Sequence, residues 1–590
     1  MHAPPPTRAP VVSPFDGGWQ AHGFFLALTL FFSLSLVIHP TDVPMGPPLG
    51  DTMTTQWNFW WVDQVMRGAT TSTEGLLHTN RLFHPLGADL SYHTMEFPYA
   101  ILLWPLRLIG GGFLQHNASL IIATYLMAWA CWLAARQWGA GRFGAAACTA
   151  ALTIHGYRLA EGIHLNIFST YLFPLTIYLL KRITNECAAG EAIRWKSAAA
   201  LGITGILALL TSLFHALECL IYLLIFVAPL LFTRRAILPA IMKQFALAGL
   251  VAAPIAAWLA WHLATAPKPP SFGPDAQVGH AADLWQFVIH PRIRMLLAGV
   301  ENNWLSVFVD GRQRAWVWYL PGYTLIVGGA IAATRLKQSG HPRMLLFAGI
   351  FFWILALGPA LKLGSPMVLN GEPTPIPLPG RLLSWVPFLG TLRSIWHFGF
   401  TGTVCIAIYT CVWLERGLAM IHEERRRLLQ ALALVIIAAE SFIGGLGSYA
   451  NRMDGAAKFL TQQKQEGAVA FFPQYFYQYR GYFMYHQTIH GRPIVGGYIA
   501  RDPIAFEDWK KERLWPIELE ETGYGRIPGL DDAGLSRMKS DMEKHNIRFV
   551  EIHDDTREKW FSGRIAAELA KTGMRVVYTD EETMVLTGGR

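Results

Sequence analysis

The stretch that decides the fold is Gly50-Asp51-Thr52-Met53-Thr54-Thr55-Gln56-Trp57-Asn58-Phe59-Trp60-Trp61-Val62-Asp63, which follows an apolar segment at 20–38. The same region continues to Ser91-Tyr92-His93-Thr94-Met95-Glu96. An apolar segment of about 20 residues can cross a lipid bilayer. Titratable and aromatic side chains therefore gather just outside a predicted membrane span, and the rest of the chain can be interpreted around them.

The composition indicates a membrane protein. Of 590 residues, 52% are hydrophobic and 15% are charged, whereas charged residues make up about a quarter of a typical globular chain. The 22 Trp residues agree with this class, because Trp is enriched at membrane interfaces. The formal net charge of +8 comes from short basic clusters between apolar runs, which argues against nucleic-acid binding.

Eleven apolar segments are candidates for membrane spans, although the third and fourth are short. They lie near 20–38, 117–135, 143–156, 169–181, 197–213, 216–233, 244–263, 316–334, 344–361, 397–414 and 428–447. We therefore expect a polytopic α-helical membrane protein with about eleven transmembrane helices.

The basic residues predict the orientation, because cytoplasmic loops are enriched in Lys and Arg. With a cytoplasmic N-terminus, every short loop on that side is basic, from Arg136 and Arg142 to Arg416 and the Arg425-Arg426-Arg427 run. Loops 39–116, 264–315 and 362–396 then face outward, as does the C-terminal tail. This arrangement predicts a multi-pass protein of the inner (cytoplasmic) membrane with a periplasmic or extracellular C-terminal domain.

The predicted domains are a transmembrane module at 1–447 and a soluble α/β domain at 448–590. Strands are expected at Gly467–Pro473, Arg548–His553, Met574–Tyr578 and Met584–Thr587, the last two as a closing pair. Helices are expected at 531–545 and 556–572.

The aromatic residues of the opening stretch recur with helical spacing. Trp57, Trp60, Trp61 and Val65 stand at i, i+3, i+4 and i+8, which is one face of a helix. An amphipathic helix with an aromatic apolar side lies flat at a membrane surface. We therefore expect these Trp side chains to anchor the segment in the membrane interface.

Asp51 lies in the linker between the first span and this helix. Asp is a preferred N-cap residue, so Asp51 could cap the helix. A carboxylate held near the membrane and partly shielded from water could also act as a general base. The two roles can coexist.

Gly50-Asp51, the Trp-containing helix, Pro85-Leu86-Gly87 and Tyr92-His93-Thr94 together resemble the GT-C superfamily of membrane glycosyltransferases. They look most like its bacterial branch of uncharacterised polytopic proteins. The resemblance implies a polyprenyl-phosphate-linked sugar donor, and it implies that Asp51 is the catalytic base that deprotonates the acceptor hydroxyl. The chain lacks the second acidic residue of an Asp-x-Asp pair, so a divalent metal, which binds several oxygen ligands, is not supported. No cofactor is predicted.

Residues 155–166 place ionisable groups at the outer ends of two short predicted spans. Such groups in a membrane are often functional. His164 and Asn166 align with a Gly-His-Leu-Asn-type stretch of the family. The structural alternative is an Arg158–Glu161 pair with capping by Asn166.

The segment Leu392-Arg393-Ser394-Ile395-Trp396-His397-Phe398 precedes another predicted span. Arg suits phosphate because its planar guanidinium donates two hydrogen bonds at once. The family has a Leu-Arg-x-Pro-x-Arg-Phe pattern here, and this chain has His397 where the pattern has its second Arg. Arg393 could therefore bind the donor phosphate, or it could anchor the span among lipid headgroups.

Two other groups of polar residues have both structural and functional interpretations. His215 and Glu218 are about one helical turn apart and could pair with each other. The Gly- and Pro-rich segment 481–503 favours a structural turn, but its His486, His490 and Arg501 could instead contact an acceptor.

The resemblance implies an inverting glycosyltransferase that moves a sugar from a polyprenyl-phosphate donor to an envelope acceptor on the outer membrane face. Asp51 is its expected general base. The expected substrate-binding residues are His93, Glu96, His164, Asn166, Arg393 and His397. Expected partners are the lipid-linked sugar, the bilayer and a glycan, lipid or protein acceptor. A lipid or glycolipid flippase and a non-catalytic scaffold for envelope assembly remain alternatives; a flippase would place polar residues through the bilayer midplane.

Overall fold

The computed structural model describes most of the chain in two compact units. The described residues are 11–45, 50–190, 195–268, 280–293, 317–336, 343–363, 365–366, 368–369, 372–373, 378–385, 392, 394–450, 454–475, 477–554 and 560–588. Unit 1 is formed by Met1–Ile38, Ser119–Trp258 and Pro270–Leu446. Unit 2 is formed by His39–Ala118, Leu259–Pro269 and Gly447–Arg590.

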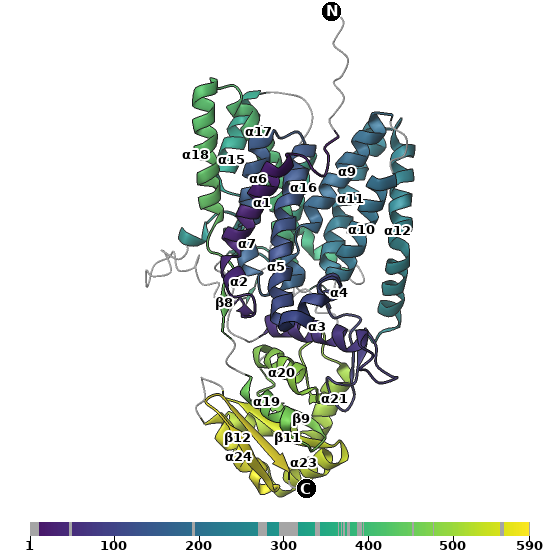
Figure 1. Ribbon diagram of the computed structural model, residues 1–590, viewed down its shortest axis with the longest axis vertical. Helices are drawn as coiled ribbons and strands as arrows, with labels where there is room; N and C mark the ends of the chain where they lie inside the picture. Colours follow the sequence, from purple (N-terminus) through teal and green to yellow (C-terminus); the bar gives the residue numbers. More distant parts are fainter. Residues whose placement is uncertain are drawn as a thin grey trace, which may run out of the picture. The chain divides into compact units, whose positions relative to one another are not determined.

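Unit 1 is a bundle of helices that run side by side in Figure 1. Its members are α1 (Gly18–Phe32), α2 (Leu34–Ile38), the later part of α5 (Trp104–Gln137), α6 (Arg142–Thr153), α7 (Gly156–Ala160), α8 (Leu165–Phe168), α9 (Leu172–Ala188), α10 (Trp195–Thr211), α11 (Leu213–Thr233), most of α12 (Leu238–Thr265), α15 (Tyr323–Leu336), α16 (Arg343–Ala356), α17 (Phe398–Leu418) and α18 (Glu423–Ser441). Each of the predicted apolar segments coincides with one or two of these helices.

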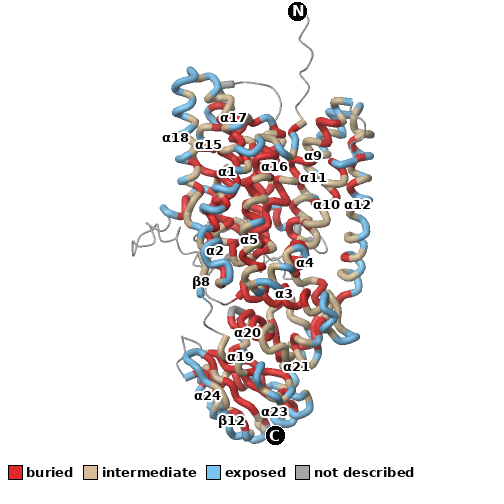
Figure 2. Tube along the Cα trace, viewed as in Figure 1, coloured by how far each residue is buried: buried red, intermediate tan, exposed pale blue. Residues whose placement is uncertain are grey.

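Four of the described helical segments are long and apolar enough to cross a membrane. They are Trp104–Gln137, Leu213–Thr233, Leu238–Thr265 and Ile395–Leu418, and shorter apolar helices accompany them. The chain is therefore a membrane protein with several apolar helices. The segment that contains α17 is almost wholly buried, whereas few residues of α12 are buried (Figure 2).

The helix α17 forms the centre of unit 1 because small residues let its neighbours approach closely. A Cβ atom at Gly402 would lie only 2.6 Å from the carbonyl oxygen of Gly349 on α16. The two backbones are therefore in direct contact at this point. Such small-residue contacts are a common way for helices to associate in membranes.

Unit 2 combines the first long loop with the C-terminal domain. The loop contributes β1 (Val43–Pro44), α3 (Asp51–Met66), β2 (His78–Thr79), β3 (Ala88–Asp89), α4 (Phe97–Leu102) and the beginning of α5. The tail contributes β8 (Ser448–Tyr449), α19 (Gly455–Gln462), β9 (Ala468–Phe472), α20 (Tyr477–His490), β10 (Ile494–Val495), α21 (Ile504–Arg513), α22 (Trp515–Gly523), α23 (Asp532–Lys544), β11 (Ile547–His553), α24 (Phe561–Lys571), β12 (Met574–Thr579) and β13 (Thr583–Gly588).

The tail forms a five-stranded mixed sheet in the order β10-β9-β11-β13-β12. Strand β9 is parallel to both β10 and β11, and the hairpin of β12 and β13 completes the sheet with antiparallel pairing. The predicted strands and the helix at 531–545 are confirmed, and the helix at 556–572 is confirmed from Phe561 onward, because residues 556–559 lie outside the described residues. One expectation was incomplete, because the first part of 481–503 belongs to α20 and the turn begins only at Gly491.

The helix α3 is buried in protein rather than exposed at a membrane surface. The side chains of Trp57 and Trp61 are fully buried and stack with ring centroids 5.7 Å apart. The Trp57 indole donates a 2.6 Å hydrogen bond to Gln487 of α20. The prediction that the Trp side chains anchor this helix in the membrane interface was therefore wrong. The aromatic face packs against the tail of the same chain instead.

Candidate functional site

Asp51 is the first residue of α3, and Gly50 occupies the N-cap position. The backbone at Gly50 has φ +76° and ψ −140°, a conformation open only to glycine at low cost. The Asp51 carboxylate therefore lies in the first turn of the helix, where the helix dipole favours a negative charge. The alternative that Asp51 itself is the N-cap residue was wrong by one position.

A close contact with α20 fixes the start of α3. Gly481 of α20 packs against Gly50, and a Cβ atom at position 481 would collide with the Gly50 carbonyl oxygen. Any larger residue at 481 would displace the turn that carries Asp51. The tail thus helps to position this carboxylate within unit 2.

A chain of hydrogen bonds connects His93, Asn58 and Glu96. The Nε2 atom of His93 lies 2.9 Å from Asn58 Oδ1, and the Asn58 amide donates a 2.7 Å bond to Glu96 Oε2. On the opposite side of the ring, the backbone N–H of Ala500 donates to His93 Nδ1 at 3.2 Å. Because Nδ1 accepts this bond, the proton of a neutral His93 must be on Nε2, where it can be donated to Asn58.

The pKa of His93 is lowered from 6.5 to about 4. Burial is the main cause, because it disfavours the charged imidazolium, and the nearby Asp51 carboxylate opposes part of this effect. His93 is therefore neutral near pH 7, in agreement with its hydrogen bonds. Asp51 and His93 are thus electrostatically coupled within unit 2.

The second carboxylate of α3, that of Asp63, is bound by basic and indole side chains of unit 2. It is 4% exposed and accepts hydrogen bonds from Arg67 Nε at 2.6 Å and from the Trp104 indole at 2.7 Å. Arg107 lies 3.8 Å away on the other carboxylate oxygen. These contacts join the end of α3 to the beginning of α5.

The predicted site residues of unit 1 lie in different local environments. His164 precedes α8, and its Nδ1 lies 2.8 Å from Glu161 Oε2. Glu161 thus pairs with His164, a contact that the sequence did not predict. Asn166 is in the first turn of α8 and is partly exposed. Arg393 lies outside the described residues.

His397 belongs to a buried polar cluster at the beginning of α17. Its Nδ1 atom lies 2.8 Å from the Tyr157 hydroxyl. The predicted pairing of His215 with Glu218 is confirmed at 2.7 Å, and the Thr401 hydroxyl donates to the same carboxylate. Tyr157, His397, Glu218 and Thr401 line a cavity of about 10 Å³, which is roughly the space of one water molecule.

The histidines of the tail have structural partners. His486 and Glu551 are both almost fully buried, and His486 Nδ1 lies 2.5 Å from Glu551 Oε1. His490 Nδ1 accepts the backbone N–H of Arg492 at 3.0 Å. The first contact joins α20 to β11, and the second lies at the end of α20. In the described part of the chain, no three His, Cys, Asp or Glu side chains converge as ligands for a metal ion.

Sequence reasoning missed Asn58, which connects two of the predicted residues. Asn58 follows Asp51 by seven residues, so both lie on the same face of α3 two turns apart. This seven-residue spacing could have identified Asn58 from the sequence. The contact between His93 and the backbone of Ala500 had no sequence signal, because any residue other than proline supplies the same N–H group.

The fold is similar to those of two solved glycosyltransferases. The arabinofuranosyltransferase AftD from Mycobacteria is similar in structure with a TM-score of 0.60 at 13% sequence identity, over 99% of this chain and 40% of AftD. The oligosaccharyltransferase from Archaeoglobus fulgidus in its apo form is similar with a TM-score of 0.52 at 13% identity, over 97% of this chain and 74% of that enzyme. The chain thus corresponds to less than half the length of AftD. No protein family and no curated protein matches its sequence.

Proposed function

We propose that the protein is an inverting glycosyltransferase that transfers a sugar from a polyprenyl-phosphate donor to an acceptor of the cell envelope. The observation that carries this proposal is the structural similarity to AftD across 99% of the chain. The site residues of unit 2 support it, because a carboxylate at the beginning of α3 is coupled to a neutral, hydrogen-bonded histidine.

Asp51 is the proposed general base. Its carboxylate takes the proton of the acceptor hydroxyl, and the resulting oxygen nucleophile attacks the anomeric carbon of the donor sugar. The bond from that carbon to the phosphate oxygen breaks, and the polyprenyl phosphate departs with the electron pair. A single displacement of this kind inverts the anomeric configuration.

The other predicted residues are proposed to bind substrate. In unit 2, His93 and Glu96 fill this role, and Asn58 holds both side chains in position through its two hydrogen bonds. In unit 1, His164, Asn166 and His397 are proposed to contact the donor. Arg393 is proposed to stabilise the negative charge that develops on the departing phosphate, which is an electrostatic form of catalysis.

The proposed topology has about eleven membrane spans and a cytoplasmic N-terminus. Its support is the distribution of Lys and Arg, which occur in every short loop assigned to the cytoplasm. The loops 39–116, 264–315 and 362–396 and the tail from 448 are then on the outer face, and the transfer reaction takes place there.

The test compares glycan and glycolipid profiles of cells that express the wild type, Asp51→Asn or no protein. Asp51→Asn should reproduce the profile of the deletion at matched protein level, because the amide cannot take the proton. Asp508→Asn is the matched control, since Asp508 is 61% exposed on α21 of the same unit, and it should match the wild type. A wild-type profile in Asp51→Asn would exclude Asp51 as the base, and lipid flipping without sugar transfer in proteoliposomes would favour a flippase.

A further inference from the structure

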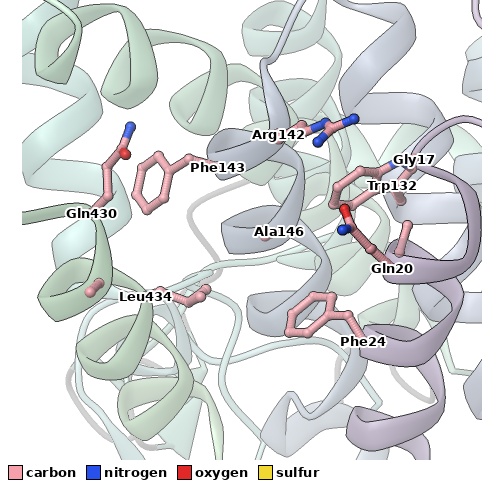
Figure 3. A pocket seen from close by; sticks show the side chains of 11 residues that line it. Gly17, Gln20, Phe24, Trp132, Arg142, Phe143, Ala146, Gln430 and Leu434 are labelled. Carbon is pink, nitrogen blue, oxygen red and sulfur yellow. The ribbon is translucent and has the colours of Figure 1, made fainter. Parts of the chain in front are cut away.

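A groove of about 360 Å³ lies between α1, α6 and α18 of unit 1 (Figure 3). Its wall is mostly apolar and includes Phe24 of α1, Trp132 of α5, Phe143 of α6 and Leu434 of α18. None of the residues proposed to take part in sugar transfer lines this groove.

Three of the helices that line the groove each contribute one polar side chain. Gln20 precedes Phe24 on α1, Arg142 precedes Ala146 on α6, and Gln430 precedes Leu434 on α18, each by four residues. Four residues correspond to about one helical turn, or roughly 6 Å along the axis. The groove therefore has a polar end near the beginnings of α1 and α6 and an apolar end one turn further on. Figure 3 shows Arg142 and Gln430 at one end and Phe24 and Leu434 at the other.

The polar end carries the positive charge of Arg142, and the Glu415 carboxylate accepts the backbone N–H of Gly144 two residues further along α6. Arg142 is exposed and forms no ion pair or hydrogen bond through its side chain with any residue that the structure describes. It is also the first residue of α6, where the helix dipole disfavours a cation. On α18, Arg426 lies one turn before Gln430, and its guanidinium pairs with the Glu423 carboxylate at 4.0 Å. An anion bound at this end would interact favourably with the Arg142 guanidinium.

The apolar end is open to the bilayer. Leu432 and Val435 of α18, beside the lining residues of that helix, are 49% and 67% exposed. On a helix of a membrane protein, exposed apolar side chains of this kind contact lipid chains. The occupant of the groove must therefore combine an anionic group with an attached hydrocarbon chain.

We propose that this groove binds one anionic membrane phospholipid. Its phosphate interacts with Arg142, the amides of Gln20 and Gln430 lie beside the headgroup, and an acyl chain lies against Phe24 and Leu434. In the proposed topology this end faces the cytoplasm, where anionic lipids attract basic residues. The proposal itself depends on the groove and its charge, not on glycosyl transfer.

The test purifies the full-length protein in a mild detergent and quantifies the co-purified phospholipids by mass spectrometry. The wild type should retain about one phosphatidylglycerol per chain in preference to phosphatidylcholine. Loss of a charge-assisted hydrogen bond should reduce this retention about tenfold in Arg142→Gln. Ala146→Trp should reduce it as well, because the indole fills the groove. Arg234→Gln, which removes an exposed cation at the end of α11, is the matched control and should retain the lipid.

A thermal-shift titration of the wild type keeps the proposal testable if a variant does not fold. Phosphatidylglycerol should raise the melting temperature in detergent, whereas phosphatidylcholine and inorganic phosphate should not. The proposal is overturned if Arg142→Gln retains as much phosphatidylglycerol as Arg234→Gln. Equal stabilisation by inorganic phosphate would also overturn it, because the groove would then bind a soluble anion.

Discussion

The neutral state of His93 makes the stability of unit 2 dependent on pH. The pKa of His93 is about 4 in the folded protein, whereas an ordinary histidine has a pKa of 6.5. At a pH between these two pKa values, His93 is protonated in the unfolded chain and neutral in the folded chain. The stabilisation is therefore complete above pH 6.5 and is lost as the pH falls toward 4. One pKa unit corresponds to about 1.4 kcal/mol, so the shift corresponds to about 3 kcal/mol.

The variant His93→Gln isolates this contribution. A glutamine amide can still donate a hydrogen bond to Asn58 Oδ1, but it does not titrate. Unfolding by guanidinium in detergent, followed by Trp fluorescence, should show that the wild type loses about 3 kcal/mol more than His93→Gln between pH 7.5 and pH 4.5. His78→Gln, a histidine of β2 in the same unit but outside this hydrogen-bond chain, is the control and should behave like the wild type.

The effect of the Asp51 carboxylate on the pKa of His93 provides a second test of the role of His93 in acid-induced unfolding. The Asp51 carboxylate raises the pKa of His93, so Asp51→Asn should lower that pKa further. The acid-induced loss of stability should then be larger in Asp51→Asn than in the wild type. If His93→Gln loses as much stability on acidification as the wild type, His93 is not the buried neutral group described above.

Three other substitutions test the packing of unit 2 in the same unfolding assay. Asn58→Leu should cost about 3 kcal/mol, because it leaves a buried carboxylate and an imidazole without their shared partner; a loss below about 1 kcal/mol would contradict the hydrogen-bond chain. Asp63→Asn should cost about 3 kcal/mol, since it leaves the mostly buried Arg107 without its carboxylate partner, and an unchanged midpoint would show that Asp63 does not stabilise unit 2. Burial raises the pKa of Glu520 from 4.5 to about 7, so the associated stability is present below pH 4.5 and is lost as the pH rises through 7. Glu520→Gln should remove about 3 kcal/mol of this dependence between pH 4.5 and pH 8, and an equally steep profile in the variant would refute the assignment.

The sequence predicted the helices and strands of the fold better than it predicted which of them pack against one another. Apolar segments of membrane length located the helices of unit 1, and short apolar runs located β9 and β11. These signals are local, because each helix or strand buries a face whose spacing is set by its own geometry. The tertiary partner of a face has no such local signal. The spacing of Trp57 and Trp61 is the same whether they contact lipid or α20, which lies more than 400 residues along the chain.

The residues of the candidate site also divide into those with a local sequence signal and those that only the tertiary fold brings together. Asp51 was chosen as a candidate from its position after the first span, and the pairing of His215 with Glu218 was predicted from their helical spacing. The connection of His93 to Asn58 depends on how the loop after α3 returns to that helix, and the backbone of Ala500 reaches the ring through the fold of the tail. Chain reversals of this kind are determined by tertiary packing, so the residues alone did not reveal them.

The most direct test of the central claim is sugar transfer by the purified protein. Proteoliposomes that contain the full-length chain would be supplied with radiolabelled polyprenyl-phosphate sugars and an envelope extract as acceptor. We predict that the wild type and Asp508→Asn transfer label to the acceptor with inverted anomeric configuration, and that Asp51→Asn lowers the rate at least about a hundredfold, as expected for loss of a general base. Transfer by Asp51→Asn at the wild-type rate would contradict the account.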